Sequence, residues 1–355
     1  MSRSPFGRLP GGEQVELFEL RSSTGVVLRV SGYGGIIQSL LVPDRHGQVD
    51  DVVLGFDRLE QYVDDQAYFG ALIGRYANRI RGGRFRLDGR QLSLPVNDNG
   101  NHLHGGPMGF HKVHWRVQPF GHEDGTVGLR LTRVSPSGEQ GYPGRLDAEV
   151  TYTLSGNDLV VDYLARTDQP TPVCMTQHTY FNLSADPATD VLDHRLQLWA
   201  DRFTPVDETL IPTGELTPVE GTPFDFREAA AIGARIGDPS AQLTRSAGYD
   251  HNFVLAGEAG TEPARAARVH DPASGRVLEV WTTEPGLQLY SGNYLDGETR
   301  GKGGRPYRQH TGFCLEPQHF PDSPNQPSFP TCILRPGERY QSRTIYRFSV
   351  DTGES

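Results

Sequence analysis

The segment Arg84-Phe-Arg-Leu-Asp-Gly-Arg-Gln-Leu-Ser-Leu94 predicts a β-hairpin. Apolar and polar residues alternate on both sides of its centre, as they do in strands that bury one face. The central pair, Asp88-Gly89, suits the two positive-φ positions that a type I′ turn requires. Strands joined by so tight a turn run antiparallel, so this segment indicates the kind of sheet to expect in the rest of the chain.

The same period of two recurs from one end of the chain to the other. It predicts strands over residues 15–20, 26–30, 36–42 and 344–350, and strand pairs over 147–154 with 159–164 and over 267–270 with 277–281. Helical signal is thin, and residues 227–236 are the best candidate, because acidic residues come early and arginine late in that segment. Strands spread evenly, without a repeat or a low-complexity linker, predict an all-β fold. We expect one domain over residues 1–355, a large antiparallel β-sandwich with few short helices.

Composition excludes several classes of protein. The chain has 355 residues and a formal charge of −10, with no basic run, so we expect no nucleic-acid partner. No stretch approaches the roughly 20 apolar residues of a membrane span, and the first residues lack the apolar core of a signal peptide. The chain has three cysteines, Cys174, Cys314 and Cys332, and this small, odd number does not suit a disulfide framework. These features predict a cytoplasmic protein without a membrane partner.

Polar residues interrupt the alternation in a few segments, and the first of these covers residues 74–80. Arg75, Asn78 and Arg79 offer guanidinium groups and an amide there, which hold hydroxyls or carboxylates in a defined orientation. The alternative is a set of surface arginines beside a turn.

A second segment, residues 101–115, contains four of the 12 histidines together with several glycines. His102 and His104 on a strand would put both rings on one face, as metal ligands often lie. However, no cysteine pair, HExxH motif or flanking aspartate completes a metal set. The segment therefore favours sugar binding or hydrogen bonding in the core over zinc.

His178 lies in a third segment, residues 172–183, which is otherwise typical of a buried strand. A lone histidine in such a run is usually a core residue. Here Thr176, Thr179, Tyr180 and Asn182 surround it with donors and acceptors, which favours a lined cavity. We therefore expect Tyr180 to contact a ligand.

Three further candidates lie later in the chain. Asp250 precedes a predicted strand, where an Asx turn is the alternative, and Gln288 lies on the polar face of a strand. Glu316 shares a strand face with the small residues Gly312 and Cys314, which leave room for a ligand. A carboxylate in that position is either a surface charge or a partly buried base, and the small neighbours favour the base.

These segments, in this order, resemble the aldose 1-epimerase (galactose mutarotase) family. The resemblance runs from residues 34–40 to residues 334–338. Its most specific motifs are Gly74-Arg-x-Ala-Asn-Arg-Ile80, Leu103-His-Gly-Gly106, His178-Thr-Tyr-Phe-Asn-Leu183, Asp250-His-Asn-Phe253 and Gly312-Phe-x-x-Glu-Pro-Gln318. The family fold that it implies is a galactose mutarotase-like supersandwich with an open sugar-binding cleft. Gln177 departs from the asparagine common in the family, and because both are amides only local geometry is affected.

The resemblance implies a role for each matching residue. Glu316 corresponds to the general base and His178 to the general acid. The residues that correspond to the family's sugar-holding groups are Asn78, Arg79, His104, Asp250 and Gln288. The reaction implied is the interconversion of α and β anomers of free hexoses such as galactose and glucose. A base and an acid on opposite sides of the ring would open the hemiacetal by proton transfer.

Ring opening of this kind involves no redox step and no group transfer, so we expect no cofactor and no metal. We expect a monomer or weak homodimer. Three alternatives remain open: a hexose-6-phosphate 1-epimerase of the same fold, a non-catalytic sugar-binding β-sandwich, and, with less support, a zinc hydrolase. The hexose 6-phosphate reading requires additional cations for the phosphate. A non-catalytic sugar-binding β-sandwich would not require a paired acid and base, so the presence of Glu316 and His178 counts against it.

Overall fold

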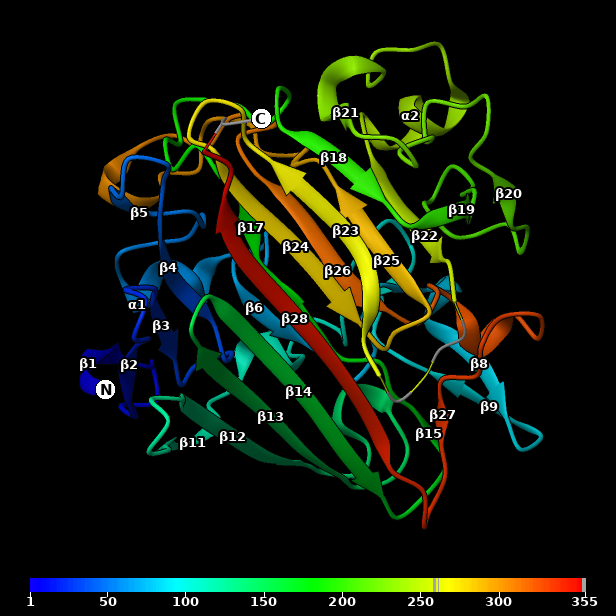
Figure 1. Cartoon of the computed structure of the whole chain (residues 1–355). Helices are drawn as coiled ribbons and strands as arrows, with labels where there is room; N and C mark the ends of the chain where they lie inside the picture. Colours follow the sequence, from blue (N-terminus) through cyan, green and yellow to red (C-terminus); the bar gives the residue numbers. More distant parts are fainter. Residues whose placement is uncertain (258–259, 261, 353–355) are drawn as a thin grey trace.

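A computed structural model describes residues 1–257, 260 and 262–352 of the chain (Figure 1). The hairpin predicted over residues 84–94 is present as β8 (Arg84–Leu87) and β9 (Arg90–Ser93). Asp88 and Gly89 between them have φ angles of 48° and 80°, as the predicted turn requires. The other predicted strands also form, and the predicted all-β class is confirmed.

The largest sheet in the described part of the chain is antiparallel throughout and faces the viewer in Figure 1. Its strands, in spatial order, are β11 (Arg116–Gly121), β12 (Val127–Ser135), β13 (Leu146–Ser155), β14 (Asp158–Thr167), β28 (Tyr340–Val350), β24 (Arg276–Thr282), β23 (Ala264–His270), β18 (Arg195–Leu198) and β21 (Ala230–Ala231). Every second residue of β13 is buried, so the period of two in its sequence reports which face meets the core.

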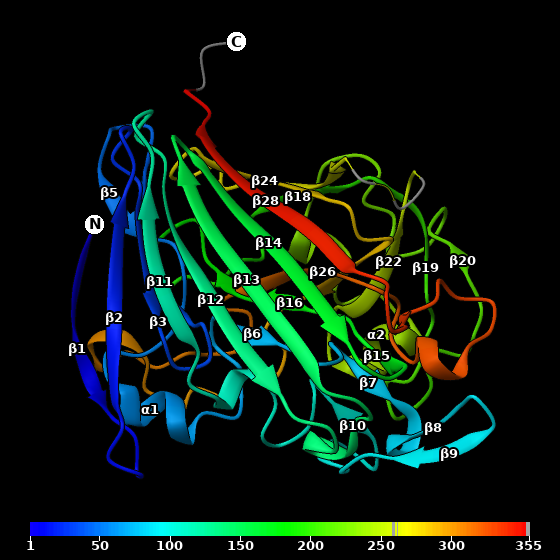
Figure 2. The same ribbon diagram turned by 90° about the horizontal axis from the view of Figure 1, so that it is seen from below.

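A second large sheet lies behind the first and carries several of the predicted site residues (Figures 1 and 2). Its order is β17 (Tyr180–Phe181), β26 (Phe313–Gln318), β25 (Gly286–Tyr290), β22 (Asp250–Leu255), β19 (Ala200–Phe203) and β20 (Thr217–Pro218). Both faces of β25 and β26 are buried. Leu289 and Leu315 pack in the core shared with Tyr346 and Phe348 of the first sheet. The opposite face of these strands is therefore free to hold polar side chains without disturbing the core.

The remaining strands form a third sheet and several short pairs. The third sheet, which lies beside β11 and β12 in Figure 2, contains β1 (Ser2–Arg8), β2 (Gln14–Arg21), β3 (Val27–Ser31), β4 (Ile37–Pro43) and β5 (Val49–Asp51). The other short pairs are β7 (Arg79–Ile80) with β10 (His102–Leu103), β6 (Ala71–Ile73) with β16 (Thr176–His178), and β15 (Thr171–Pro172) with β27 (Ile333–Leu334). β16 contacts β26, and Arg79 of β7 reaches Asp250 of β22, so the first two of these pairs lie beside the second sheet.

The helix predicted over residues 227–236 is wrong. That segment contains the short strand β21, which pairs with β18, followed by a 3₁₀ turn over Ile232–Ala234. Ile232 is fully buried and Gly233 lies so close to Leu192 that an added Cβ would meet the Leu192 Cβ at 2.8 Å. Packing and strand pairing at the sheet edge therefore override the helix propensity of this alanine-rich run, because tertiary contacts outweigh local propensity.

Helices are few, as predicted. The described residues contain two short α-helices, α1 (Leu59–Asp64) and α2 (Ala241–Ser246). Within this same part of the chain, no helix has both the length and the apolar character required to cross a bilayer.

Candidate active site

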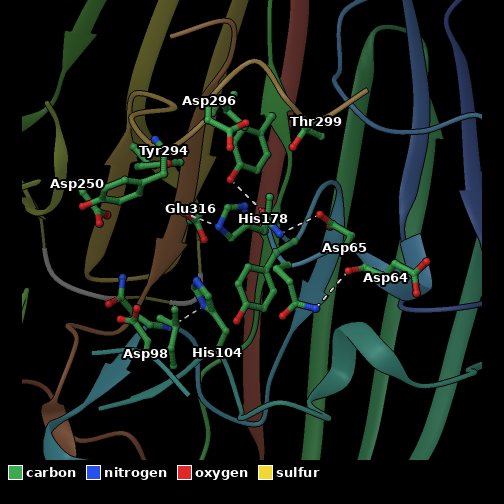
Figure 3. Close-up of a pocket in the computed structure, with 18 of the residues that line it drawn as sticks. Asp64, Asp65, Asp98, His104, His178, Asp250, Tyr294, Asp296, Thr299 and Glu316 are labelled. Carbon is green, nitrogen blue, oxygen red and sulfur yellow. Dashed lines mark hydrogen bonds and ion pairs between the residues drawn. The ribbon is translucent and has the colours of Figure 1, made fainter. Parts of the chain in front are cut away.

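A pocket of about 590 Å³ lies at the polar face of β26. Its walls come from α1, β7, β10, β16, β17, β22, β25 and β26, and from loops that include the segment between α1 and β6 and the segment after β25 (Figure 3). Seven of the eight predicted site residues line it, namely Asn78, Arg79, His104, His178, Tyr180, Asp250 and Glu316. Folding thus gathers segments that are separated by up to about two thirds of the chain.

Strand register brings Glu316 and His178 together. In the antiparallel pair β17–β26, Tyr180 lies opposite Cys314. Continuing this register by two residues puts position 178 opposite position 316, because the two chains run in opposite directions. The His178 Nε2 and Glu316 Oε1 atoms are 3.8 Å apart. The expected arrangement on opposite sides of a sugar ring is wrong, since the two groups lie side by side with no room for a ring between them.

Burial tunes the protonation of both groups. Both side chains are almost fully buried, and Glu316 Oε2 has no hydrogen-bond partner within the described residues. Burial raises the pKa of Glu316 well above its usual value, with Asp250 adding to the rise and Arg79 opposing it. Burial also lowers the pKa of His178 to about 4. The carboxylate is therefore a stronger base than an exposed one, and the imidazolium is a stronger acid.

His104 presents a hydrogen-bond donor to the pocket. The backbone N–H of Asn78 donates to His104 Nδ1 at 3.1 Å. Burial lowers the pKa of His104 well below its usual value, with the nearby His178 and Arg79 contributing, so the ring is neutral. A neutral imidazole that accepts at Nδ1 carries its proton on Nε2. His104 is thus a neutral donor in the pocket wall.

The same histidine decides whether the pocket suits a metal. Ligand atoms of His104, His178 and Glu316 lie within 4.8 Å of one another, which is the one such group found in the described residues. A metal would bind the lone pair of His104 Nε2, and that nitrogen carries the proton because Nδ1 is already an acceptor. The donor set therefore does not fit a metal without breaking the bond from Asn78.

Arg79 and Asp250 form the charged end of the pocket. Arg79 Nε donates to Asp98 Oδ2 at 2.8 Å, and Arg79 Nη1 lies 3.6 Å from Asp250 Oδ2. Gln288 is absent from the pocket lining and lies behind Asp250, where its Nε2 donates to Asp250 Oδ1 at 2.6 Å. Gln318 Nε2 in turn donates to Gln288 Oε1 at 3.1 Å, which fixes the orientation of the Gln288 amide. The Asp250 carboxylate therefore faces the pocket in a fixed orientation, where it can accept hydrogen bonds from a ligand.

Asn78 and Tyr180 complete the predicted set. Asn78 has a φ of 64°, and its Oδ1 accepts the backbone N–H of Arg79 at 2.8 Å, which leaves its amide nitrogen as the donor. The Tyr180 hydroxyl donates to the backbone oxygen of Ala67, while its ring stacks on His178 with centroids 5.1 Å apart. Tyr180 thus contributes its ring to the pocket and uses its hydroxyl to anchor the neighbouring segment.

Several polar residues considered from the sequence lie elsewhere. His102 does not share a face with His104: its ring nitrogens contact the backbone oxygen of Pro95 and the hydroxyl of Tyr142, and His104 turns away with a φ of 52°. Asn182 donates to the backbone oxygens of Asp186 and Thr189 in the loop that follows it, and to that of Thr311. Arg75 is buried and binds backbone oxygens of the segment between β12 and β13. These side chains stabilise loops and do not line the pocket.

Sequence reasoning missed Tyr68 and Asp98. The Tyr68 ring stacks on His178 with centroids 5.7 Å apart and contacts the edge of His104 at 4.7 Å, so it packs against both histidines. Asp98 is the ion-pair partner of Arg79. Both residues lie in irregular segments between strands, where the alternation that located the other candidates gives no signal.

Comparison with known proteins agrees with this architecture. The family profile of aldose 1-epimerase matches residues 16–347. The chain is 50% identical to the galactose mutarotase of Rattus norvegicus over 99% of each chain. It is 41% identical to the aldose 1-epimerase of Escherichia coli K12, over 96% of this chain and 97% of the other. A solved aldose epimerase homologue from C. elegans matches with a TM-score of 0.86 at 30% identity, over 94% of this chain and 98% of that one.

Proposed function

The chain belongs to the aldose 1-epimerase family, and from this premise we propose which residues interconvert the anomers and which aldoses are accepted. The protein is an isomerase that acts on carbohydrates. Glu316 is the general base and His178 the general acid. The observation that carries this assignment is the pair of oppositely tuned, buried groups whose Nε2 and Oε1 atoms lie 3.8 Å apart at one pocket wall.

The side-by-side arrangement suits ring opening. The C1 hydroxyl oxygen and the ring oxygen are both bonded to C1, so the two protons move at neighbouring atoms. Glu316 takes the proton from the C1 hydroxyl while protonated His178 gives its proton to the ring oxygen, and the bond from C1 to the ring oxygen breaks. Rotation about C1–C2 in the open aldehyde, followed by the reverse proton transfers, closes the ring as the other anomer. The pair ends with the protons it had at the start.

The remaining lining residues orient the sugar. Arg79, Asn78 and His104 offer donors, and Asp250 offers an acceptor held by Gln288. A pyranose has hydroxyls around its ring that donate and accept, so these groups hold C1 next to the pair. Such orientation accounts for a large part of the rate of enzymatic reactions. Tyr68 and Tyr180 both stack on the His178 ring and keep it in place.

Pocket charge favours free aldoses over hexose 6-phosphates. The acidic lining residues are Asp64, Asp65, Asp98, Asp250, Asp296 and Glu316. Among the described lining residues, Arg79 is the one lysine or arginine, and it is already paired with Asp98 and Asp250. A phosphate dianion would meet like charges here without a free cation, which costs binding energy. We therefore propose galactose and glucose as substrates.

The optical rotation of freshly dissolved α-galactose and α-glucose tests this proposal. We expect the enzyme to accelerate the decay for both free sugars, and to act on the 6-phosphates at least about tenfold less well in kcat/KM, the factor that corresponds to 1.4 kcal/mol. Binding without faster decay would indicate a sugar-binding module instead. Faster decay for the 6-phosphates would overturn the proposed substrate class.

Replacement of Arg79 by alanine is expected to raise KM and lower kcat together, because a group that both binds and orients the sugar affects both constants. The change also leaves the largely buried Asp98 and Asp250 without their cation. We therefore expect a loss of stability of about 3 kcal/mol in urea unfolding. Arg335→Ala is the matched control, since Arg335 is half exposed and pairs with the equally exposed Asp88 outside the pocket lining. Equal effects of the two substitutions would contradict the role given to Arg79.

We also infer that the whole chain acts as one domain, as a monomer or weak homodimer in the cytoplasm. The match of the family over nearly the whole chain supports a single functional unit. Cys174, Cys314 and Cys332 are free, buried thiols, which supports a reducing compartment.

A further inference from the structure

Asp98 is a carboxylate in the pocket wall that takes no part in the proposed proton transfers (Figure 3). It lies in the short segment between β9 and β10. The backbone N–H groups of Asn97 and Asp98 both donate to the backbone oxygen of Asn101. The side chain of Asn97 also donates to and accepts from the backbone of Leu103. These hydrogen bonds hold the segment, and with it Asp98, at the pocket.

Asp98 and Asp250 share the guanidinium of Arg79. Arg79 Nε donates to Asp98 Oδ2 at 2.8 Å, and Arg79 Nη1 lies 3.6 Å from Asp250 Oδ2. The Arg79 side chain is only 9% exposed, so solvent screens these contacts weakly. Asp98 makes the shorter contact and therefore contributes most to neutralising the cation.

Apart from the base and the acceptor already assigned, the other acidic side chains of the pocket wall act on a bound anion less directly. Asp65 accepts backbone N–H groups of its own loop at 2.8 and 3.0 Å. Asp64 and Asp296 are exposed, so water and salt screen their charges. The Asp98 side chain is 22% exposed and is bonded directly to Arg79, the cation that an anionic ligand would require.

We propose that Asp98 is a specificity-determining residue that makes the pocket reject aldoses with a negative charge at C6, namely hexuronates and hexose 6-phosphates. This inference rests on the proposed function and assigns the choice of substrate to one side chain. The carboxylate occupies Arg79 and also repels an anionic sugar, and a repulsive group discriminates between ligands of similar shape. Repulsion acts over about 8 Å at physiological ionic strength, so it does not require contact between Asp98 and C6.

Replacing Asp98 by asparagine isolates the effect of the charge. The asparagine Oδ1 can still accept the Arg79 Nε–H, so the guanidinium keeps its orientation. Asp250 remains as an ionic partner, so the buried cation is not left alone. We expect kcat/KM for galactose to stay within about threefold of the wild type, because the groups that orient a neutral sugar are retained. Asp98→Ser removes the same charge in a smaller side chain and repeats the test independently.

Two substrates of nearly the same shape separate charge from size. Galacturonate has a carboxylate at C6, and galacturonamide has a neutral carboxamide there. We expect kcat/KM of the wild type to be at least about tenfold lower for galacturonate, and this difference to shrink about tenfold in Asp98→Asn. Asp64→Asn is the matched control, because it makes the same chemical change at an exposed aspartate of the same pocket. The control is expected to keep the wild-type difference within about twofold.

Polarimetry at low ionic strength gives the rates for galactose and both derivatives, and calorimetric titration gives the affinities. An unchanged difference between galacturonate and galacturonamide in Asp98→Asn would overturn the proposal, as would an equal change in Asp64→Asn. An equal loss on all three sugars would reduce Asp98 to a structural role and would also overturn it. A wild type without turnover of galactose would contradict the proposed function instead, and the affinities would still show whether Asp98 excludes anions.

Discussion

Replacing Glu316 by glutamine is expected to lower kcat by about 10³-fold, because the amide keeps the shape of the side chain and loses its basicity. Sugar binding should change little, since Glu316 contributes one of several polar contacts in the pocket. The loss should therefore fall on kcat rather than on KM. Polarimetry with α-galactose gives the rate, and calorimetric titration with galactose gives the affinity. The substitution also removes a buried carboxyl whose Oε2 lacks a partner in the described residues, so the fold should tolerate it.

Glu60→Gln is the matched control, because it makes the same chemical change at an exposed position on α1. The control should retain the wild-type rate and affinity. Turnover of Glu316→Gln within about tenfold of the wild type would mean that another group is the base, because a general base contributes about 10² to 10⁴ in rate. A loss of sugar binding in Glu316→Gln would instead give the carboxylate a role in holding the substrate.

Replacing His178 by asparagine is expected to lower kcat by about 10²- to 10³-fold. The asparagine amide can donate a hydrogen bond to the ring oxygen but cannot release a proton to it. Protonation would then fall to water, although the pocket wall is buried around this position. The same polarimetric assay measures the loss. Thermal unfolding checks the fold, since the smaller side chain leaves the rings of Tyr68 and Tyr180 without their stacking partner.

The double variant separates two explanations for these losses. If Glu316 and His178 act as one proton-transferring pair, the second substitution should add little to the first, because residues that act as a unit are strongly non-additive. Multiplicative losses would show that the two residues act in separate steps. A His178→Asn variant with nearly normal kcat would contradict the assignment of the acid.

The fold was largely predictable because strand burial follows a local rule. The alternation in residues 147–164 predicted a hairpin, and β13 and β14 pair in that register. Asp88-Gly89 predicted the turn between β8 and β9 because few residue pairs accept two positive φ angles. The prediction failed over residues 227–236, where the local helix propensity of an alanine-rich run competed with strand pairing at a sheet edge. Propensity is local, and pairing with β18 is not.

The candidate site was predictable in part. Polar residues in strands that otherwise read as buried, such as His178 and Glu316, are conspicuous because a buried polar group requires a partner or a function. Tyr68 and Asp98 were missed because they lie in irregular segments without a periodic signal. Gln288 was found, but its place behind Asp250 depends on the register between β22 and β25.

By itself, the sequence determined the class of fold, the order of the strands along the chain and the chemical groups available for a reaction. These follow from local spacing and side-chain chemistry, which need no knowledge of distant residues. Only the tertiary structure decided that positions 178 and 316 meet, that their burial shifts both pKa values in opposite directions, and which nitrogen of His104 carries the proton. The physical reason is that desolvation and hydrogen-bond partners at this site come from segments far apart in sequence, which packing alone brings together.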